Sequence, residues 1–165
     1  MIKTKKIIFQ FALVLVTAIT SAQNSSDYWQ QEVDYTMTID VNAKEHQYQG
    51  EQTLVYTNNS QDTLTKAFYH LYFNAFQPGS QMDVRSRTIK DPDSRVGSRI
   101  SKLAKDEIGY IKVDELVQNG NTVDYEVVGT VLEVDLAQPI LPGETSTFDM
   151  KFNAQVPLQI RRSGR

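Results

Sequence analysis

The chain has 165 residues, of which 40% are hydrophobic and 22% are charged, with no cysteine and a formal net charge of −3 at pH 7. The length is typical of one domain, and the absence of cysteine excludes a disulfide framework and thiol chemistry. The acidic balance argues against nucleic acid and anionic lipid as binding partners.

The first 22 residues have the three-part pattern of a secretion signal. Lys3, Lys5 and Lys6 form a basic start, the range 7–19 is apolar apart from one Gln and one Thr, and small residues at 20–22 precede Gln23. We expect cleavage after Ala22 and export to the periplasm or the medium. The apolar stretch is shorter than the ~20 residues of a membrane-spanning helix, so we expect no stable membrane span.

The range 23–165 is expected to form one domain, which begins with strand patterns. Residues 33–42 alternate apolar and polar side chains at nearly every step, and this predicts a half-buried strand. A turn-like segment at 43–46 precedes a second strand at 48–56, in which Gly50 marks either a bulge or a close approach. A third pattern, 64–73, has apolar residues on both faces and predicts a strand that is covered on both sides.

The range 78–107 is predicted to be one long polar insertion. It contains seven basic and five acidic residues, and only 100–104 has helical spacing, for about one turn. A segment of roughly thirty residues without regular structure is usually functional or disordered. We favour a solvated insertion, packed over the sheet edge or against a neighbouring domain, over an anion site, because no glycine-rich phosphate cradle accompanies the arginines.

Strand patterns resume at 108–113, and Asn119-Gly120 is a strong signal for a tight turn. Further strands are predicted at 123–127, 132–136 and 148–156. About seven short strands without a long amphipathic helix predict an all-β fold, an antiparallel β-sandwich. The residues expected in its core are Tyr35, Met37, Ile39, Leu54, Phe68, Leu132, Val134, Phe148, Met150 and Phe152.

No catalytic, cofactor-binding or metal-binding residue is predicted in this chain. The two histidines, His46 and His70, have 23 residues between them and belong to no His-Glu-x-x-His segment, whereas zinc ligands usually come from close spacings. The acidic residues of the first strand are interpreted as a solvated strand face, although two carboxylates could in principle do glycosidase chemistry; they are Glu32, Asp34 and Asp40. The segment Asn58-Asn59-Ser60 matches a glycosylation acceptor and is interpreted as a turn.

Three features together resemble the N-terminal β domain of zinc aminopeptidases of the aminopeptidase N family, especially secreted bacterial members. They are the order of strands, the phrase Phe68-Tyr69-His70-Leu71-Tyr72-Phe73-Asn74, and the turns at 119–120 and 141–144. The resemblance runs from about Tyr28 to Val156, and the insertion 78–107 departs from it. It implies a curved, saddle-like β domain that packs beside a catalytic domain of the same polypeptide.

The family's zinc motif and its Gly-x-Met-Glu-Asn segment, which binds the amino terminus of the peptide substrate, are both absent from the sequence. The resemblance therefore implies that this chain is a non-catalytic front part, incomplete at its C-terminal end. Zinc is expected in the missing catalytic domain. The competing hypothesis is a free-standing secreted binding or adhesion module. Most aromatics alternate with polar residues, as core positions do, so no exposed aromatic platform for sugars is expected.

Overall fold

The computed structural model describes residues 29–90 and 93–165. The chain divides into two units, Met1–Gln30 and Gln31–Arg165, and the described helices and strands all belong to the second. The predicted secretion signal at 1–22 lies outside the described residues. Within the described ranges, no helix is both long enough and apolar enough to cross a membrane.

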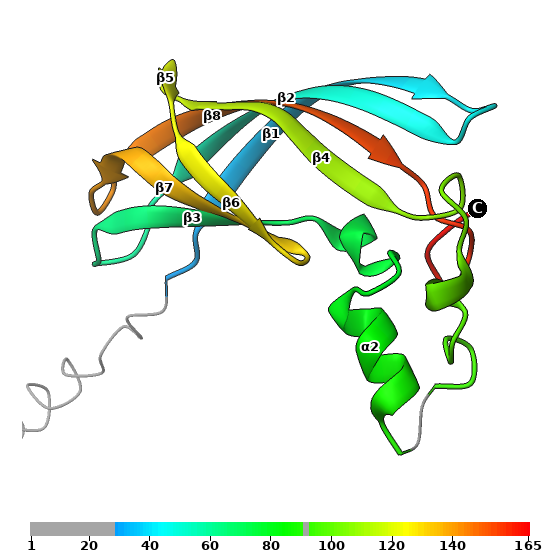
Figure 1. Ribbon diagram of the computed structural model, residues 1–165. Helices are drawn as coiled ribbons and strands as arrows, with labels where there is room; N and C mark the ends of the chain where they lie inside the picture. The colour runs from blue at the N-terminus through cyan, green and yellow to red at the C-terminus, as the bar shows by residue number, and fades with distance from the viewer. Residues whose placement is uncertain (1–28, 91–92) are drawn as a thin grey trace, which may run out of the picture. The chain divides into compact units, whose positions relative to one another are not determined.

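Two antiparallel sheets form the unit 31–165, with three short helices on the chain between strands β3 and β4 (Figure 1). The larger sheet has the order β1 (Glu32–Asn42), β2 (Gln47–Thr57), β8 (Thr145–Gln155), β4 (Tyr110–Gln118) and β5 (Asn121–Thr122). The smaller has the order β3 (Leu64–His70), β7 (Val131–Ile140) and β6 (Asp124–Val128). The predicted all-β antiparallel sandwich is confirmed.

Turn chemistry sets the strand register at two places. Asn119 and Gly120 both have positive φ, 49° and 78°, which is the backbone of a type I′ hairpin turn and confirms the predicted tight turn. Gly50 lies inside an unbroken β1–β2 register, so it is not a bulge. A Cβ atom at Gly50 would overlap the ring of Phe152, and the glycine therefore permits the predicted close approach.

The core lies between the sheets, and both contribute to it. Leu54, Phe148 and Met150 are buried from the larger sheet, as Leu132 and Val134 are from the smaller sheet. All five were predicted as core residues. Phe148 also meets Tyr69 of β3 edge to face, with ring centroids 6.4 Å apart and planes at 78°. This contact joins the two sheets.

Four of the predicted core residues are exposed instead. Tyr35, Met37 and Ile39 of β1 are 53%, 49% and 41% exposed, because the three-stranded sheet does not extend over β1. Phe68 is 61% exposed, since it pairs with Glu133 on the outer face of the smaller sheet. The third predicted strand is therefore covered on one side only, and it ends at His70. Phe152, the tenth predicted core residue, is half-buried.

The insertion has more structure than its sequence predicted. The chain forms 3-10 helix η1 (Tyr72–Ala75), then α2 (Gln81–Thr88) and 3-10 helix η2 (Ile100–Lys102), of which only η2 matches a predicted helical turn. Ser80 is the N-cap of α2, and its hydroxyl accepts a hydrogen bond from the amide of Asp83 at 3.2 Å. Periodicity gave no signal for α2, because it has no apolar stripe.

A second apolar cluster explains how the insertion is held. Phe76, Val96, Ile100 and Ile160 are buried together, away from the sandwich core. The guanidinium of Arg99 donates to the carbonyls of Gln159 and Ile160 at 2.8 and 2.9 Å. The insertion is thus tied to the segment that follows β8, and it is not simply solvated.

We expect the substitution Asp83→Asn to destabilise this insertion. The buried carboxylate of Asp83 accepts hydrogen bonds from Arg87 at 3.0 and 3.1 Å and from the amide of Gly79 at 2.9 Å. Burial raises the pKa of Asp83, but these bonds outweigh burial and hold the pKa below its ordinary value. The stabilisation is therefore present above the pKa of the unfolded chain and is lost as the pH falls through the folded-state pKa.

Hydrogen exchange of the α2 amides at neutral pH measures this effect. The variant should lose about 1–3 kcal/mol of local stability, because amide replaces the charged partner of Arg87. Asp106→Asn, an exposed acid of the same insertion, is the matched control and should change little. Equal protection of α2 in both variants would show that the Asp83 network does not hold the helix.

Candidate functional site

The structure places the two histidines apart in the fold. His46 ends the turn between β1 and β2 of the larger sheet, with φ of 57°. His70 ends β3 of the smaller sheet and stacks on Tyr72, with ring centroids 5.0 Å apart. Within 29–90 and 93–165, no group of three or more His, Cys, Asp or Glu side chains is arranged to hold a metal ion.

The turn formed by Asn58-Asn59-Ser60 is structural. Asn58 is fully buried, and its Nδ2 donates to the carbonyls of Asp62 and Ile140 at 2.8 and 3.0 Å. Its Oδ1 accepts from the amide of Ser60 at 3.1 Å, which closes an Asx-type turn. The side chain that glycosylation would modify is therefore buried and already hydrogen-bonded within the fold.

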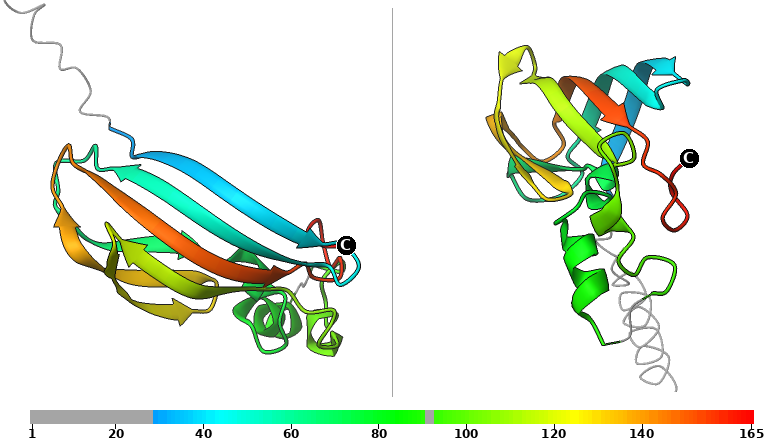
Figure 2. Two further views of the ribbon diagram at one scale, coloured as in Figure 1. Left: turned by 90° about the horizontal axis from the view of Figure 1, so that it is seen from above. Right: turned by 45° about the vertical axis from the view of Figure 1, so that its right-hand side comes forward.

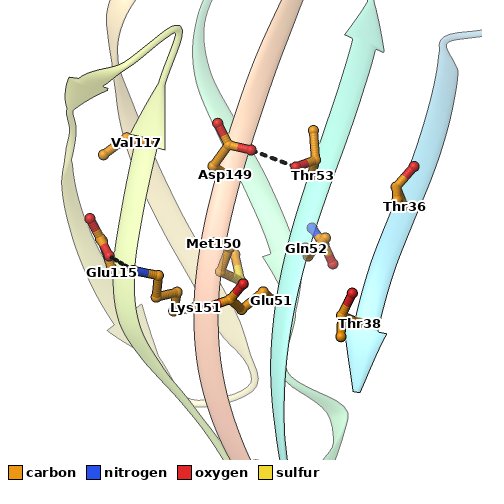
Figure 3. A pocket seen from close by; sticks show the side chains of 10 residues that line it. All are labelled: Thr36, Thr38, Glu51, Gln52, Thr53, Glu115, Val117, Asp149, Met150 and Lys151. Carbon is orange, nitrogen blue, oxygen red and sulfur yellow. Dashed lines mark hydrogen bonds and ion pairs between the residues drawn. The ribbon is translucent and has the colours of Figure 1, made fainter. Parts of the chain in front are cut away.

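A shallow polar hollow of about 310 Å³ lies on the outer face of the larger sheet (Figure 3). Thr53 donates to Asp149 at 2.6 Å, and Lys151 pairs with Glu115 at 2.9 Å. The hydrogen bond with Glu115 raises the pKa of Lys151. Both contacts are cross-strand pairs on an exposed surface, where solvent screens an ion pair and its contribution to stability is small. The hollow pairs a threonine hydroxyl with a carboxylate, but no histidine, cysteine or serine lines it, and we interpret it as a solvated sheet face.

The inner face of β1 has a different character. Five apolar side chains from alternate positions lie there in a row and remain exposed: Val33, Tyr35, Met37, Ile39 and Val41. Their register partners on β2 include Leu54, which is buried in the sandwich core, so the row continues the core surface outward. A contiguous apolar row of this kind usually marks an interaction surface.

An apolar groove of about 380 Å³ opens at one end of this row. It lies between β1 and β3, with Val33 and Tyr35 on one side and Leu64 and Ala67 on the other. Tyr69 also lines it, and burial, together with the nearby Tyr35 hydroxyl, raises the pKa of Tyr69 well above its usual range. The Tyr69 hydroxyl stays protonated at neutral pH, and the apolar side chains around it make the groove suited to apolar groups.

Gln52 adds an unusual polar group to the inner face. It lies between Met37 and Met150 in the register and is 8% exposed. Its Nε2 has no hydrogen-bond acceptor in the part of the chain that the structure describes. A buried donor without an acceptor costs about 1–3 kcal/mol, and such groups call for an explanation.

The acidic residues of β1 lie on the opposite, outer face, as the alternation predicted. Glu32, Asp34 and Asp40 are exposed, and Thr36 and Thr38 separate Asp34 from Asp40 on this face. No histidine or second carboxylate is paired with any of them by the described hydrogen bonds or ion pairs. They belong to a charged strand face.

Comparison with known proteins identifies the fold. No family model matches the sequence, and no curated protein matches it. A solved two-domain M1 zinc metallopeptidase, bound to L-tryptophan, matches with a TM-score of 0.50 and 17% identity over 82% of this chain. The fold is one that M1 zinc metallopeptidases contain. This chain spans 23% of the length of that enzyme.

A second match is the M1 zinc metallopeptidase from Deinococcus radiodurans, at 18% identity over 78% of this chain and 21% of its own, with a TM-score of 0.48. The resemblance inferred from the sequence is confirmed at the level of fold. The sequence did not predict that β1 is uncovered or that a groove lies beside it. Alternation along a strand looks the same whether its apolar face meets a second sheet or solvent.

Proposed function

We propose that this chain is the non-catalytic β domain of a zinc metallopeptidase that removes N-terminal residues from peptides. The observation that carries the proposal is the fold shared with part of an M1 zinc metallopeptidase over 82% of this chain. Peptide hydrolysis at neutral pH needs a metal-activated water, about three protein ligands and a general base. The proposal assigns these groups and the zinc ion to a catalytic domain of the same polypeptide.

In this proposal the β domain acts indirectly. It forms one wall of the substrate cleft and holds the geometry of the catalytic domain. The proposal also includes export: cleavage after Ala22 would release a periplasmic or secreted product. N-terminal sequencing of exported protein should begin at Gln23, and a retained leader would contradict this part of the proposal.

Activity measurements test the central claim. The 165-residue chain should not cleave an aminoacyl-anilide substrate and should not bind zinc tightly. The polypeptide encoded by a reading frame that continues past codon 165 and includes His-Glu-x-x-His should do both. A chelator should abolish its activity, and added zinc should restore it. Zinc-dependent cleavage by the short chain, or an inert long one, would overturn the proposal.

A free-standing secreted binding or adhesion module is the second candidate, and one observation favours it. Phe68 and Tyr72 are 61% and 67% exposed, and Tyr72 stacks on His70, so aromatic rings are presented on the outer side of the smaller sheet. The sequence predicted no such platform because aromatics were expected at core positions, whereas these two rings are exposed. A stop codon directly after codon 165, with sugar binding that Phe68→Ala and Tyr72→Ala abolish, would favour the module.

A further inference from the structure

Strand β1 is a long edge strand with no partner on one side. It is the first strand in the order of the larger sheet, and the described part of the chain places no strand beyond it. Figure 2 shows it along one border of that sheet. In an antiparallel pair, every second residue directs its N–H and C=O groups away from the neighbouring strand. Over the 11 residues of β1, these groups form a free hydrogen-bonding edge.

Apart from its acidic residues, this edge lacks the features that usually prevent another strand from pairing. The segment Glu32–Asn42 contains no proline and no lysine, and its register with β2 runs through 11 residue pairs without a bulge. The other sheet edges are shorter. β5 has 2 residues and pairs only with the end of β4, whose remaining part, 110–116, has an irregular register with β8. β6 has 5 residues, and β3 has 7 with an irregular register after Leu64. β1 is thus the most open edge among the described strands.

The apolar side of β1 is also incomplete. Its inner row is exposed, the groove opens beside Val33 and Tyr35, and the Nε2 of Gln52 lacks an acceptor on the same face. An added strand would extend the sheet and bring apolar side chains against this row. The edge and the inner face therefore favour the same kind of ligand, an extended polypeptide.

The charges of β1 decide which polypeptide fits. Glu32, Asp34 and Asp40 are its only charged residues, and all three lie on the outer face. If two copies of β1 paired antiparallel about Met37, Asp34 would lie opposite Asp40 of the other copy. Parallel pairing in register would place each acid beside itself. Like charges in directly opposite positions destabilise strand pairing, so these two alignments with a second copy of the chain are disfavoured.

We propose that β1 binds an extended segment of a partner polypeptide in which apolar residues alternate with Lys or Arg. The segment adds a strand to the larger sheet, directs its apolar side chains to the inner row and the groove, and pairs its basic side chains with Asp34 and Asp40. Backbone hydrogen bonds supply affinity in this mode of recognition, and alternate side chains supply specificity. The proposal does not rest on the peptidase assignment.

A synthetic peptide tests it: acetyl-Lys-Val-Lys-Val-Thr-Val-Lys-Val-Lys-amide, titrated into the 165-residue chain at low salt. The peptide should bind, and the amides of β1 that exchange fast in the free chain should become protected. A peptide with Glu in place of each Lys should not bind. Replacing the central Thr with Pro should weaken binding, because proline cannot donate a backbone hydrogen bond.

Charge reversal on the protein supplies the matched comparison. The double variant Asp34→Lys with Asp40→Lys should bind the Lys peptide with about tenfold lower affinity, since two attractive cross-strand pairs become repulsive. It should also bind the Glu peptide, which shows that the variant is folded. The control variant, Asp124→Lys with Glu126→Lys, changes the net charge by the same amount but on β6 of the smaller sheet. Like the unaltered chain, it should bind the Lys peptide and should not bind the Glu peptide.

Three results would overturn the proposal. The first is the absence of Lys-peptide binding to the unaltered chain. The second is equal binding by the β1 and β6 variants, which would locate the contact elsewhere. The third is protection of all β1 amides before peptide is added, which would mean that the edge is already occupied. Sedimentation would then identify the occupant: a dimer would indicate a second copy, and a monomer would indicate a segment of the same chain.

Discussion

Replacing Phe148 with alanine is expected to lower the free energy of unfolding by about 3–5 kcal/mol. Phe148 is 1% exposed on β8, and its ring packs edge to face on Tyr69 of the smaller sheet. Truncation removes buried apolar surface and leaves a cavity between the two sheets. The cavity would persist because interstrand hydrogen bonds hold the backbone of each sheet in place. It also removes the aromatic contact that joins those sheets. Chemical denaturation with a two-state fit measures the change.

Phe68→Ala is the control for the Phe148 substitution. The two residues have the same side chain and both lie in strands, but Phe68 is on the outer face of the smaller sheet and is mostly exposed. Its truncation should cost less than about 1 kcal/mol. Similar losses for both variants would mean that the faces of the smaller sheet are assigned the wrong way round.

The difference between these two phenylalanines shows where sequence reasoning succeeds. Period-2 alternation correctly paired Phe148 with Met150 on one face of β8, because polar residues mark the other face unambiguously. Around Phe68 the chain is apolar at consecutive positions, so the pattern could not distinguish the inner from the outer face. The exposed ring of Phe68 then became visible only from its register partner, Glu133.

β1 shows a second limit. Its boundaries and faces followed from alternation, but its exposure depends on how far the smaller sheet extends, and that is a property of the whole fold. The groove beside β1 also depends on the whole fold, since its lining residues come from strands of both sheets. Local patterns predict elements and faces, whereas the candidate site depends on what the topology leaves uncovered.

The insertion shows a third limit. Helix α2 is held by a capping serine, by the ion pair of buried Asp83 with exposed Arg87 and by contacts with η1, and it has no apolar stripe that periodicity could reveal. A capping signal was present in the sequence, where Ser80 precedes Asp83 by three residues. Recognition of that spacing would have predicted the start of α2.

The second large effect is expected for Asn58→Ala, which should lower the free energy of unfolding by about 2–4 kcal/mol. The side chain of Asn58 makes hydrogen bonds with Gln31, Ser60, Asp62 and Ile140, and it is fully buried. Alanine would leave the carbonyl of Ile140, at the end of β7, without this buried donor. The turn after β2 would also lose the acceptor that organises Ser60.

The position of Asn58 makes the loss global. It follows β2 of the larger sheet and bonds to the end of β7 of the smaller sheet, and its backbone carbonyl accepts from Gly143 at 2.7 Å. The side chain therefore fastens the two sheets at one end of the sandwich. Gln61→Ala, an exposed position of the same turn, should change stability by less than about 0.5 kcal/mol. An equally small change in the free energy of unfolding for Asn58→Ala would mean that water replaces the lost hydrogen bonds. The side chain of Asn58 would then not stabilise the contact between the two sheets.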